Sequence, residues 1–307
     1  MDNTPLRFTP PRLDIPEGAV DTHVHVFDPS GFQFAEGRTY TPGVATLDDL
    51  RACHAALGVS RAVLVQPSVY GTDNSCLLDA LQSGTERLCG IAVVDLDGIT
   101  GSDLVALDAA GVRGIRLNLE VRHEHDPVHV RSELERAASA INAPGWCVQI
   151  HCGADVLPVV EATLDAFRVP LVLDHFAGLK SSDADPGSRR LAVLQRLLAS
   201  GRIYVKLSAF YRASTQTPHH VDLAPLARRL IETRPDRLLW GSDWPHTGGG
   251  KSRNPSRIEP FREVDLRASL AALASWSTDA AVLRQILVDN PAALYSFAAT
   301  RQSKETP

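Results

Sequence analysis

The feature that most constrains the fold is a regular alternation of short apolar runs with longer segments of helical periodicity. Most of the runs are rich in Val, Ile and Leu, as strands buried on both faces should be. Helix-sized segments between them favour parallel pairing through right-handed crossovers. Eight such units predict a single (β/α)₈ barrel of the α/β class, with a doubly wound open sheet as the alternative. The expected strands are Ala19–Val26, Ala62–Gln66, Leu88–Asp95, Gly114–Leu119, Cys147–His151, Leu171–His175, Ile203–Leu207 and Leu238–Ser242.

Local signals mark where several helices begin and end. Thr46 and Asp49 form a variant capping box, and Gly58 can take the left-handed conformation that ends the helix they begin. Near the C-terminus, Asn290 is expected to be an N-cap with Pro291 in the first helical position. Helices are therefore expected after the eighth strand as well as between the strands.

The chain shows no composition change that would separate two folded domains. Residues 1–17 are proline-rich and are expected to form an N-terminal extension, residues 18–299 the barrel, and residues 300–307 a polar tail. The segment Gly248–Pro260 is rich in Gly, Ser, Pro and Arg and closely follows the eighth strand. We expect it to be a mobile active-site loop.

Composition excludes several classes of protein. The formal charge of −5 comes from 31 basic and 36 acidic residues, which argues against a nucleic-acid partner. No apolar run approaches the roughly 18 residues of a membrane span, so no membrane partner is expected. The five cysteines match no zinc motif and are expected to be reduced. These features predict a cytoplasmic enzyme, and they leave a homo-oligomer open.

A pair of histidines ends the first expected strand. His23 and His25 are two residues apart, so their side chains point to the same face of the strand, which in a barrel is the candidate inner face. Two imidazoles flanked by buried apolar residues are costly unless both rings find partners. This pair is therefore the first candidate for the functional site.

Further polar residues stand where other expected strands stop. His151 and His175 end the fifth and sixth strands, and Asp243 follows the eighth. Catalytic groups in barrel enzymes come from these carboxyl-terminal strand ends. Imidazole and carboxylate groups could bind one divalent cation such as Zn or Mn, or could polarise a carbonyl and activate water without metal. Both routes lead to hydrolysis at a carbonyl carbon.

Arginines near the same ends of the strands suggest an anionic substrate. Arg116 lies in the fourth strand, Arg122 in the loop after it, and Arg212 after the seventh strand. Arginine pairs bidentately with carboxylates, although for any single arginine a surface salt bridge is equally expected. Four further residues could supply neutral hydrogen bonds to the substrate: Tyr40, Ser68, Tyr70 and Thr72.

Four motifs together resemble the amidohydrolase superfamily of TIM-barrel metal-dependent hydrolases. They are Val20-Asp-Thr-His-Val-His25, Leu173-Asp-His175, Gly241-Ser-Asp-Trp-Pro-His246 and Asn290-Pro-Ala-Ala-Leu-Tyr295. Two more segments, Val65-Gln-Pro-Ser-Val-Tyr-Gly-Thr-Asp-Asn74 and Arg113-Gly-Ile-Arg-Leu-Asn118, are similar to the branch that contains the pyrone dicarboxylate lactonases. The resemblance extends over nearly the whole chain and implies a distorted (β/α)₈ barrel.

The resemblance also implies roles for individual residues. Asp243 would activate water and later donate a proton, while His23, His25 and His175 would surround the substrate carbonyl. Substrate carboxylates would be held by Tyr40, Ser68, Arg116, Arg122 and Arg212. His246, at the end of its motif, is a further candidate for substrate binding.

The fifth strand departs from the pyrone lactonase pattern, which implies an aromatic residue and catalysis without metal. His151 stands there and restores the superfamily's usual metal-ligand set of His23, His25, His151 and Asp243. No lysine ends the fourth strand, which argues against a bridged pair of metal ions. One divalent cation and metal-free catalysis therefore both stay open.

The leading hypothesis is a lactonase, a carboxylic ester hydrolase that opens an anionic ring from aromatic-compound or sugar-acid catabolism. The 2-pyrone-4,6-dicarboxylate, sugar-acid and sulfomuconolactone lactonases are the reactions considered. A metal-dependent decarboxylase of the same superfamily is the second hypothesis. A barrel that only binds a ligand or partner is the third.

Overall fold

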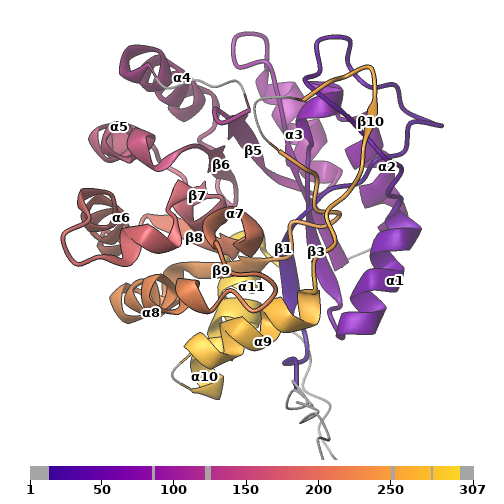
Figure 1. Ribbon diagram of the computed structural model, residues 1–307. Coiled ribbons are helices and arrows are strands. Elements are labelled where there is room, and N and C mark those ends of the chain that lie inside the picture. The colour runs from indigo at the N-terminus through magenta and orange to yellow at the C-terminus, as the bar shows by residue number, and fades with distance from the viewer. Residues whose placement is uncertain (1–13, 85–86, 122–125, 250–252, 278, 298–307) are drawn as a thin grey trace, which may run out of the picture.

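The computed structural model describes residues 14–84, 87–121, 126–249, 253–277 and 279–297, and the eight expected strands all form. They make one parallel sheet in the order β1-β3-β4-β5-β6-β7-β8-β9, with helices around its outer face (Figure 1). This is a TIM-barrel α/β fold, as predicted. The strands are β1 (Val20–Val24), β3 (Arg61–Val65), β4 (Leu88–Ala92), β5 (Val112–Asn118), β6 (Cys147–His151), β7 (Leu171–Leu173), β8 (Ile203–Ser208) and β9 (Leu238–Gly241).

The barrel closes between its first and last strands. A parallel bridge joins Val24 to Trp244, and the Asp243 N–H donates to the carbonyl of His23 at 2.9 Å. Gly241 permits this approach, because a Cβ there would lie 2.7 Å from the Cβ of His23. The Asp21 carboxylate, fully buried in β1, also accepts a hydrogen bond from the Ser242 N–H at 2.8 Å.

The helices begin where the local signals place them, with one exception. Thr46 and Asp49 form the expected capping box, and Gly58 is left-handed with φ 76°. The helices are α1 (Leu47–Leu57), α2 (Ser75–Gly84), α3 (Gly101–Ala109), α4 (Pro127–Ala140), α5 (Leu157–Thr163), α6 (Arg189–Ala199), α7 (Phe210–Ala213), α8 (Ala224–Thr233), α9 (Leu266–Trp276), α10 (Ala280–Arg284) and α11 (Asn290–Tyr295).

The exception is Asn290, which is not an N-cap. A π-helical segment, Gln285–Asp289, joins α10 to α11, so no new helix terminus forms there. The Asn290 amide instead donates to the carbonyls of Pro235 and Leu238, each at 2.8 Å. The Asn-Pro pair therefore attaches the C-terminal helices to the start of β9.

Part of the loop after the barrel's last strand has regular structure that the sequence did not predict. β10 (Ile258–Glu259) pairs in parallel with β2 (Thr41–Pro42), far earlier in the chain. Thr41 Oγ1 also donates to the carbonyl of Pro255 at 2.6 Å. These contacts attach the loop to the segment that follows β1 (Figure 1).

The inside of the barrel is apolar near the strand starts. Val20, Cys89 and Cys147 pack there with Leu294 and Tyr295 of α11. All five cysteines are free thiols, as predicted. Within the described residues, no helix is long and apolar enough to cross a membrane. The buried polar residues of the candidate site lie toward the opposite, carboxyl ends of the strands.

Candidate active site

Three histidines surround one carboxylate oxygen at the carboxyl ends of the strands. His23 lies in β1 and His25 directly follows it, His175 follows β7, and Asp243 follows β9. The Nε2 atoms of His23, His25 and His175 lie 3.5, 3.7 and 3.8 Å from Asp243 Oδ1. All four side chains are buried. The sequence-predicted cluster of catalytic residues thus forms as one group.

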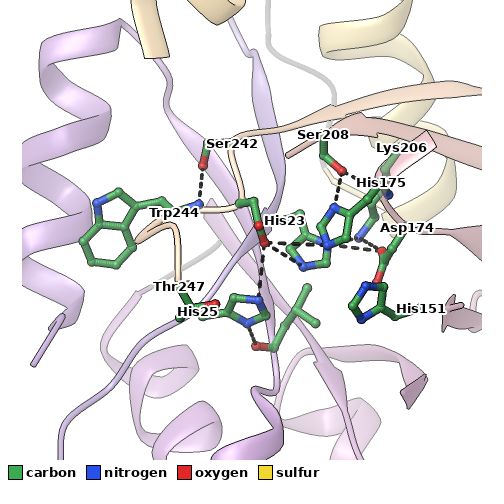
Figure 2. Close-up of polar contacts among 12 residues, drawn as sticks. His23, His25, His151, Asp174, His175, Lys206, Ser208, Ser242, Trp244 and Thr247 are labelled. Carbon is green, nitrogen blue, oxygen red and sulfur yellow. Dashed lines mark hydrogen bonds and ion pairs between the residues drawn. The ribbon is translucent and has the colours of Figure 1, made fainter. Parts of the chain in front are cut away.

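Unusual backbone conformations place two of these four residues. Asp243 has φ 62°, and His175 begins a run of left-handed residues with φ 51°. Such conformations are uncommon for non-glycine residues and are retained where the surrounding structure enforces them, often at functional sites. The hydroxyl of Ser208, at the end of β8, lies 2.8 Å from His175 Nδ1 and fixes that ring (Figure 2).

The partners of the Nδ1 atoms determine the tautomers of two rings. His25 Nδ1 lies 2.7 Å from the carbonyl of Val65, which can only accept, so this nitrogen carries the proton. His23 Nδ1 lies 3.1 Å from a carboxylate oxygen of Asp174 and donates in the same way. In the neutral rings, both Nε2 atoms therefore present a lone pair on the side of Asp243.

Burial keeps the rings neutral. It lowers the pKa of His23 to about 3 and lowers the pKa values of His175 and His151 well below the usual range. Burial alone would raise the pKa of Asp243, yet that pKa lies well below its usual range, and the guanidinium of Arg212 is among the groups that lower it. We regard Asp243 as ionised because Tyr211 and Arg212 also donate to its second oxygen.

These four donors fit a divalent cation. His23 Nε2 is buried and, among the described residues, makes no hydrogen bond. Lone pairs directed at an ionised carboxylate repel it unless a positive charge lies between them. His23, His25 and Asp243 form one candidate ligand group, and His23, Asp174 and His175 form another. Imidazole and carboxylate donors in this number are typical of a catalytic zinc or similar ion.

His151 lies at the edge of this cluster. Its ring packs edge-on against His175 with 5.0 Å between centroids, and Nδ1 lies 3.2 Å from the side-chain oxygen of Asn118. Neither candidate ligand group among the described residues includes it. The ligand set expected from the sequence included His151 and not His175. In the structure it is His175 that lies next to the Asp243 carboxylate.

Asp243 is held on its other side by two residues of α7. The Tyr211 hydroxyl donates to Asp243 Oδ2 at 2.5 Å, and Arg212 Nε donates to the same oxygen at 3.4 Å. One carboxylate oxygen therefore faces the histidines while the other is fixed by protein donors. Arg212 was expected near the site from the sequence, whereas Tyr211 was not.

A small cavity of about 40 Å³ adjoins the cluster and contains many of the expected substrate-binding residues. Its lining includes Tyr40, Ser68, Arg116 and Arg212, together with Arg253 from the loop after β9. A neighbouring pocket of about 500 Å³ shares Ser68 and Arg116 and adds Thr72. The two hollows share Ser68 and Arg116, so the small space beside Asp243 adjoins the larger pocket.

Other expected binding residues lie elsewhere. The Tyr70 hydroxyl accepts a hydrogen bond from the Asp28 N–H at 3.0 Å and lines neither of these hollows. His246 is buried behind the Asp243 turn and lines a separate groove with Trp244 and Phe261. Arg122 lies outside the described residues.

Sequence reasoning missed several polar residues of the site. Asp174 lies in the motif Leu173-Asp-His175, in which the sequence indicated a functional role only for His175. Lys206 interrupts the apolar strand β8, and a lysine within such an apolar run is the signal that could have identified it as a buried polar residue. Arg253 stacks on the Tyr40 ring at 3.4 Å from its centroid, a contact that no local pattern indicates.

Comparison with known proteins agrees with this arrangement. The amidohydrolase family model matches residues 20–297. This chain belongs to the amidohydrolase family. It is 34% identical over 290 residues to a 4-sulfomuconolactone hydrolase of Rhizobium radiobacter, covering 94% of this chain and 93% of that protein. It is also 34% identical over 296 residues to a 2-pyrone-4,6-dicarboxylate hydrolase of Comamonas testosteroni, covering 93% and 92%.

A solved structure from Acinetobacter baumannii, with citric acid bound, matches with a TM-score of 0.71 and 28% identity. The match covers 91% of this chain and 100% of that one. The site described above therefore belongs to an amidohydrolase-type hydrolase.

Proposed function

We propose that this enzyme opens the ring of a small anionic lactone by adding water to the ring carbonyl. The observation that carries the proposal is the Asp243 carboxylate, set among three neutral imidazoles beside a cavity lined by Arg116, Arg212 and Arg253. Relatives named as lactone and pyrone dicarboxylate hydrolases support this class of substrate. A 2-pyrone-4,6-dicarboxylate-like ring and a sulfomuconolactone are the two leading candidates.

Asp243 is proposed as the base and, later, the acid. Because it is ionised, its Oδ1 can accept a proton from the attacking water and then deliver that proton to the ring oxygen as the C–O bond breaks. Tyr211 and Arg212 hold Oδ2, so Oδ1 stays directed at the histidines during this exchange. His23, His25 and His175 would orient the carbonyl and stabilise its developing negative charge.

Charged and neutral donors around the cavity would hold the substrate's acidic groups. Arg116 and Arg212 supply guanidinium groups, while Tyr40 and Ser68 supply hydroxyls. Citric acid bound in the Acinetobacter relative is a small polycarboxylate and is consistent with such a lining. Arg122 and Thr72 stay as further candidates for this role, and Tyr70 and His246 are weaker ones because they lie away from the cavity.

A single divalent cation is proposed to bind His23, His25 and Asp243, with His175 adjacent and His151 as the outermost candidate. When bound, it would polarise the carbonyl and make water more acidic. The protein's own contribution would be the fixed tautomers of His23 and His25, which direct both Nε2 lone pairs to one point.

The test is an assay of the purified protein with 2-pyrone-4,6-dicarboxylate and 4-sulfomuconolactone, following ring absorbance and base consumption, with and without added Zn or Mn. We expect ring opening by the wild type and a loss of at least about 10³-fold in Asp243→Asn, because the proton acceptor is removed. Asp183→Asn, which changes a buried carboxylate that caps the short helical turn Ser181–Ala184, is the matched control.

Equal activity in Asp243→Asn and wild type would contradict the assigned role of the carboxylate. Release of carbon dioxide in place of ring opening would favour the decarboxylase alternative. Elemental analysis of the active protein decides between one bound cation and metal-free catalysis.

A further inference from the structure

A closed network of charged and polar side chains lies inside the barrel beneath the catalytic cluster. It joins His23 of β1, Arg116 of β5, Gln149 of β6, Asp174 after β7 and Lys206 of β8. Gln149 and Lys206 are completely buried, and Asp174 is 1% exposed. Neither the water-activating role of Asp243 nor the binding of substrate anions explains why Gln149, Asp174 and Lys206 are inside the barrel.

Asp174 is the centre of the network. Its Oδ1 accepts from His23 Nδ1 at 3.1 Å and lies 3.6 Å from Lys206 Nζ. Its Oδ2 accepts from Arg116 Nε and Nη2 at 3.3 and 3.2 Å. The Gln149 amide donates to Oδ2 at 3.1 Å. Each oxygen therefore has its own partners, one group on the catalytic side and one on the substrate-binding side.

Lys206 completes the network from below. Its Nζ donates to the carbonyl of Thr22 and to Gln149 Oε1, both at 2.7 Å, and lies 3.4 Å from His23 Nδ1. These contacts fix the backbone just before His23 and orient the Gln149 amide toward Asp174. Buried charges contribute little net stability compared with apolar residues of the same size, so retaining three of them favours a functional reason.

We propose that Asp174 is a positioning residue that couples substrate binding to catalysis. Through Oδ1 it keeps the proton of His23 on Nδ1, so that the Nε2 lone pair faces Asp243. Through Oδ2 it fixes the guanidinium of Arg116. Among the described residues Arg116 bonds Asp174 through Nε and Nη2 only, which leaves Nη1 for a substrate anion. Lys206 and Gln149 keep the carboxylate in place.

The part of this inference that concerns the substrate's anion rests on the proposed function. The part that concerns the tautomer of His23 does not. The test is therefore Asp174→Asn, which keeps the side-chain shape, examined in two ways. Ring-nitrogen NMR of ¹⁵N-histidine protein, with His23 assigned by its loss in His23→Gln, reports the tautomer without substrate. Steady-state kinetics with the lactones then separate kcat from KM.

We expect wild-type His23 to be protonated on Nδ1 and the variant to show a mixture of tautomers. Loss of a partner behind a catalytic or ligand histidine typically lowers activity about 10- to 100-fold, so we expect a fall of that size in kcat. KM should rise as well, because Arg116 loses its anchor. Asp183→Asn, the matched control, should change neither kinetic parameter.

If Asp174→Asn does not fold, Gln149→Leu tests the same coupling from the other side. It removes one donor to Oδ2 and the acceptor of Lys206, so KM should rise several-fold while His23 keeps its Nδ1 proton. An unchanged His23 tautomer together with kcat within twofold of wild type in Asp174→Asn would overturn the inference. In Gln149→Leu, an unchanged KM would do so. A wild type that opens no lactone would refute only the proposed function.

Discussion

At the scale of single residues, the site depends on the different roles of the two oxygens of the Asp243 carboxylate. Asp243 directs Oδ1 at three imidazoles, while its Oδ2 is fixed by Tyr211 and Arg212. A carboxylate fixed on one side keeps its reactive oxygen in place with little loss of entropy on substrate binding. Asp174, behind His23, is divided in the same way: one of its oxygens accepts a hydrogen bond from His23 and the other accepts one from Arg116.

Tyr211→Phe tests this division of tasks. The variant loses the hydroxyl that donates to Asp243 Oδ2 at 2.5 Å. Since a hydrogen bond to a charged group contributes about 1.5–3 kcal/mol, we expect kcat to fall by at least about tenfold with KM nearly unchanged. Steady-state kinetics measure this effect. Tyr204→Phe, in the apolar end of the barrel, is the control, and an equal loss in both variants would argue against a specific role.

At the scale of elements, the loop after β9 covers the site through contacts far apart in sequence. β10 pairs with β2, Arg253 forms a bidentate ion pair with Glu259, and its guanidinium stacks on Tyr40. The sequence predicted an active-site loop over Gly248–Pro260, and Arg253 of that loop lines the cavity beside Asp243. It did not reveal the strand pairing, because a two-residue strand carries no periodicity.

Arg253→Ala tests whether this loop contributes to substrate binding. Arg253 bonds Glu259 through Nε and Nη2, which leaves Nη1 available among the described contacts. Loss of a cation from the cavity wall should raise KM for a dianionic lactone about tenfold, with a smaller effect on kcat. Arg257→Ala, an exposed arginine of the same loop, is the control. A KM unchanged by Arg253→Ala would limit this loop to a covering role.

At the scale of the whole molecule, the closure of the barrel and the geometry of the site depend on the same contacts. β9 approaches β1 at Gly241, beside His23, and the backbone of Asp243 bonds the backbone of His23. Asp21 reinforces this seam by accepting from Ser242 N–H and His54 Nε2. A change in the seam should therefore alter both stability and catalysis.

Gly241→Ala tests that connection. The added Cβ would lie 2.7 Å from His23 Cβ and 3.0 Å from its backbone nitrogen, so the strands must move apart. Overpacking of this kind costs about 1–3 kcal/mol, and we expect a lower Tm together with reduced kcat. Thermal denaturation and kinetics measure both. Gly101→Ala, where a Cβ meets no atom within 4 Å, should leave both unchanged.

The sequence by itself determined the eight strands, most helix boundaries, and the presence of histidines and an aspartate at strand ends. These features depend on periodicity and capping, which act over a few residues. Only the tertiary structure decided that Asn290 bonds β9 instead of capping a helix, that Tyr70 faces Asp28, and that His151 lies beside His175. It alone joined His23 to Asp174 and Lys206, because those contacts span more than 150 residues and arise only when the barrel closes.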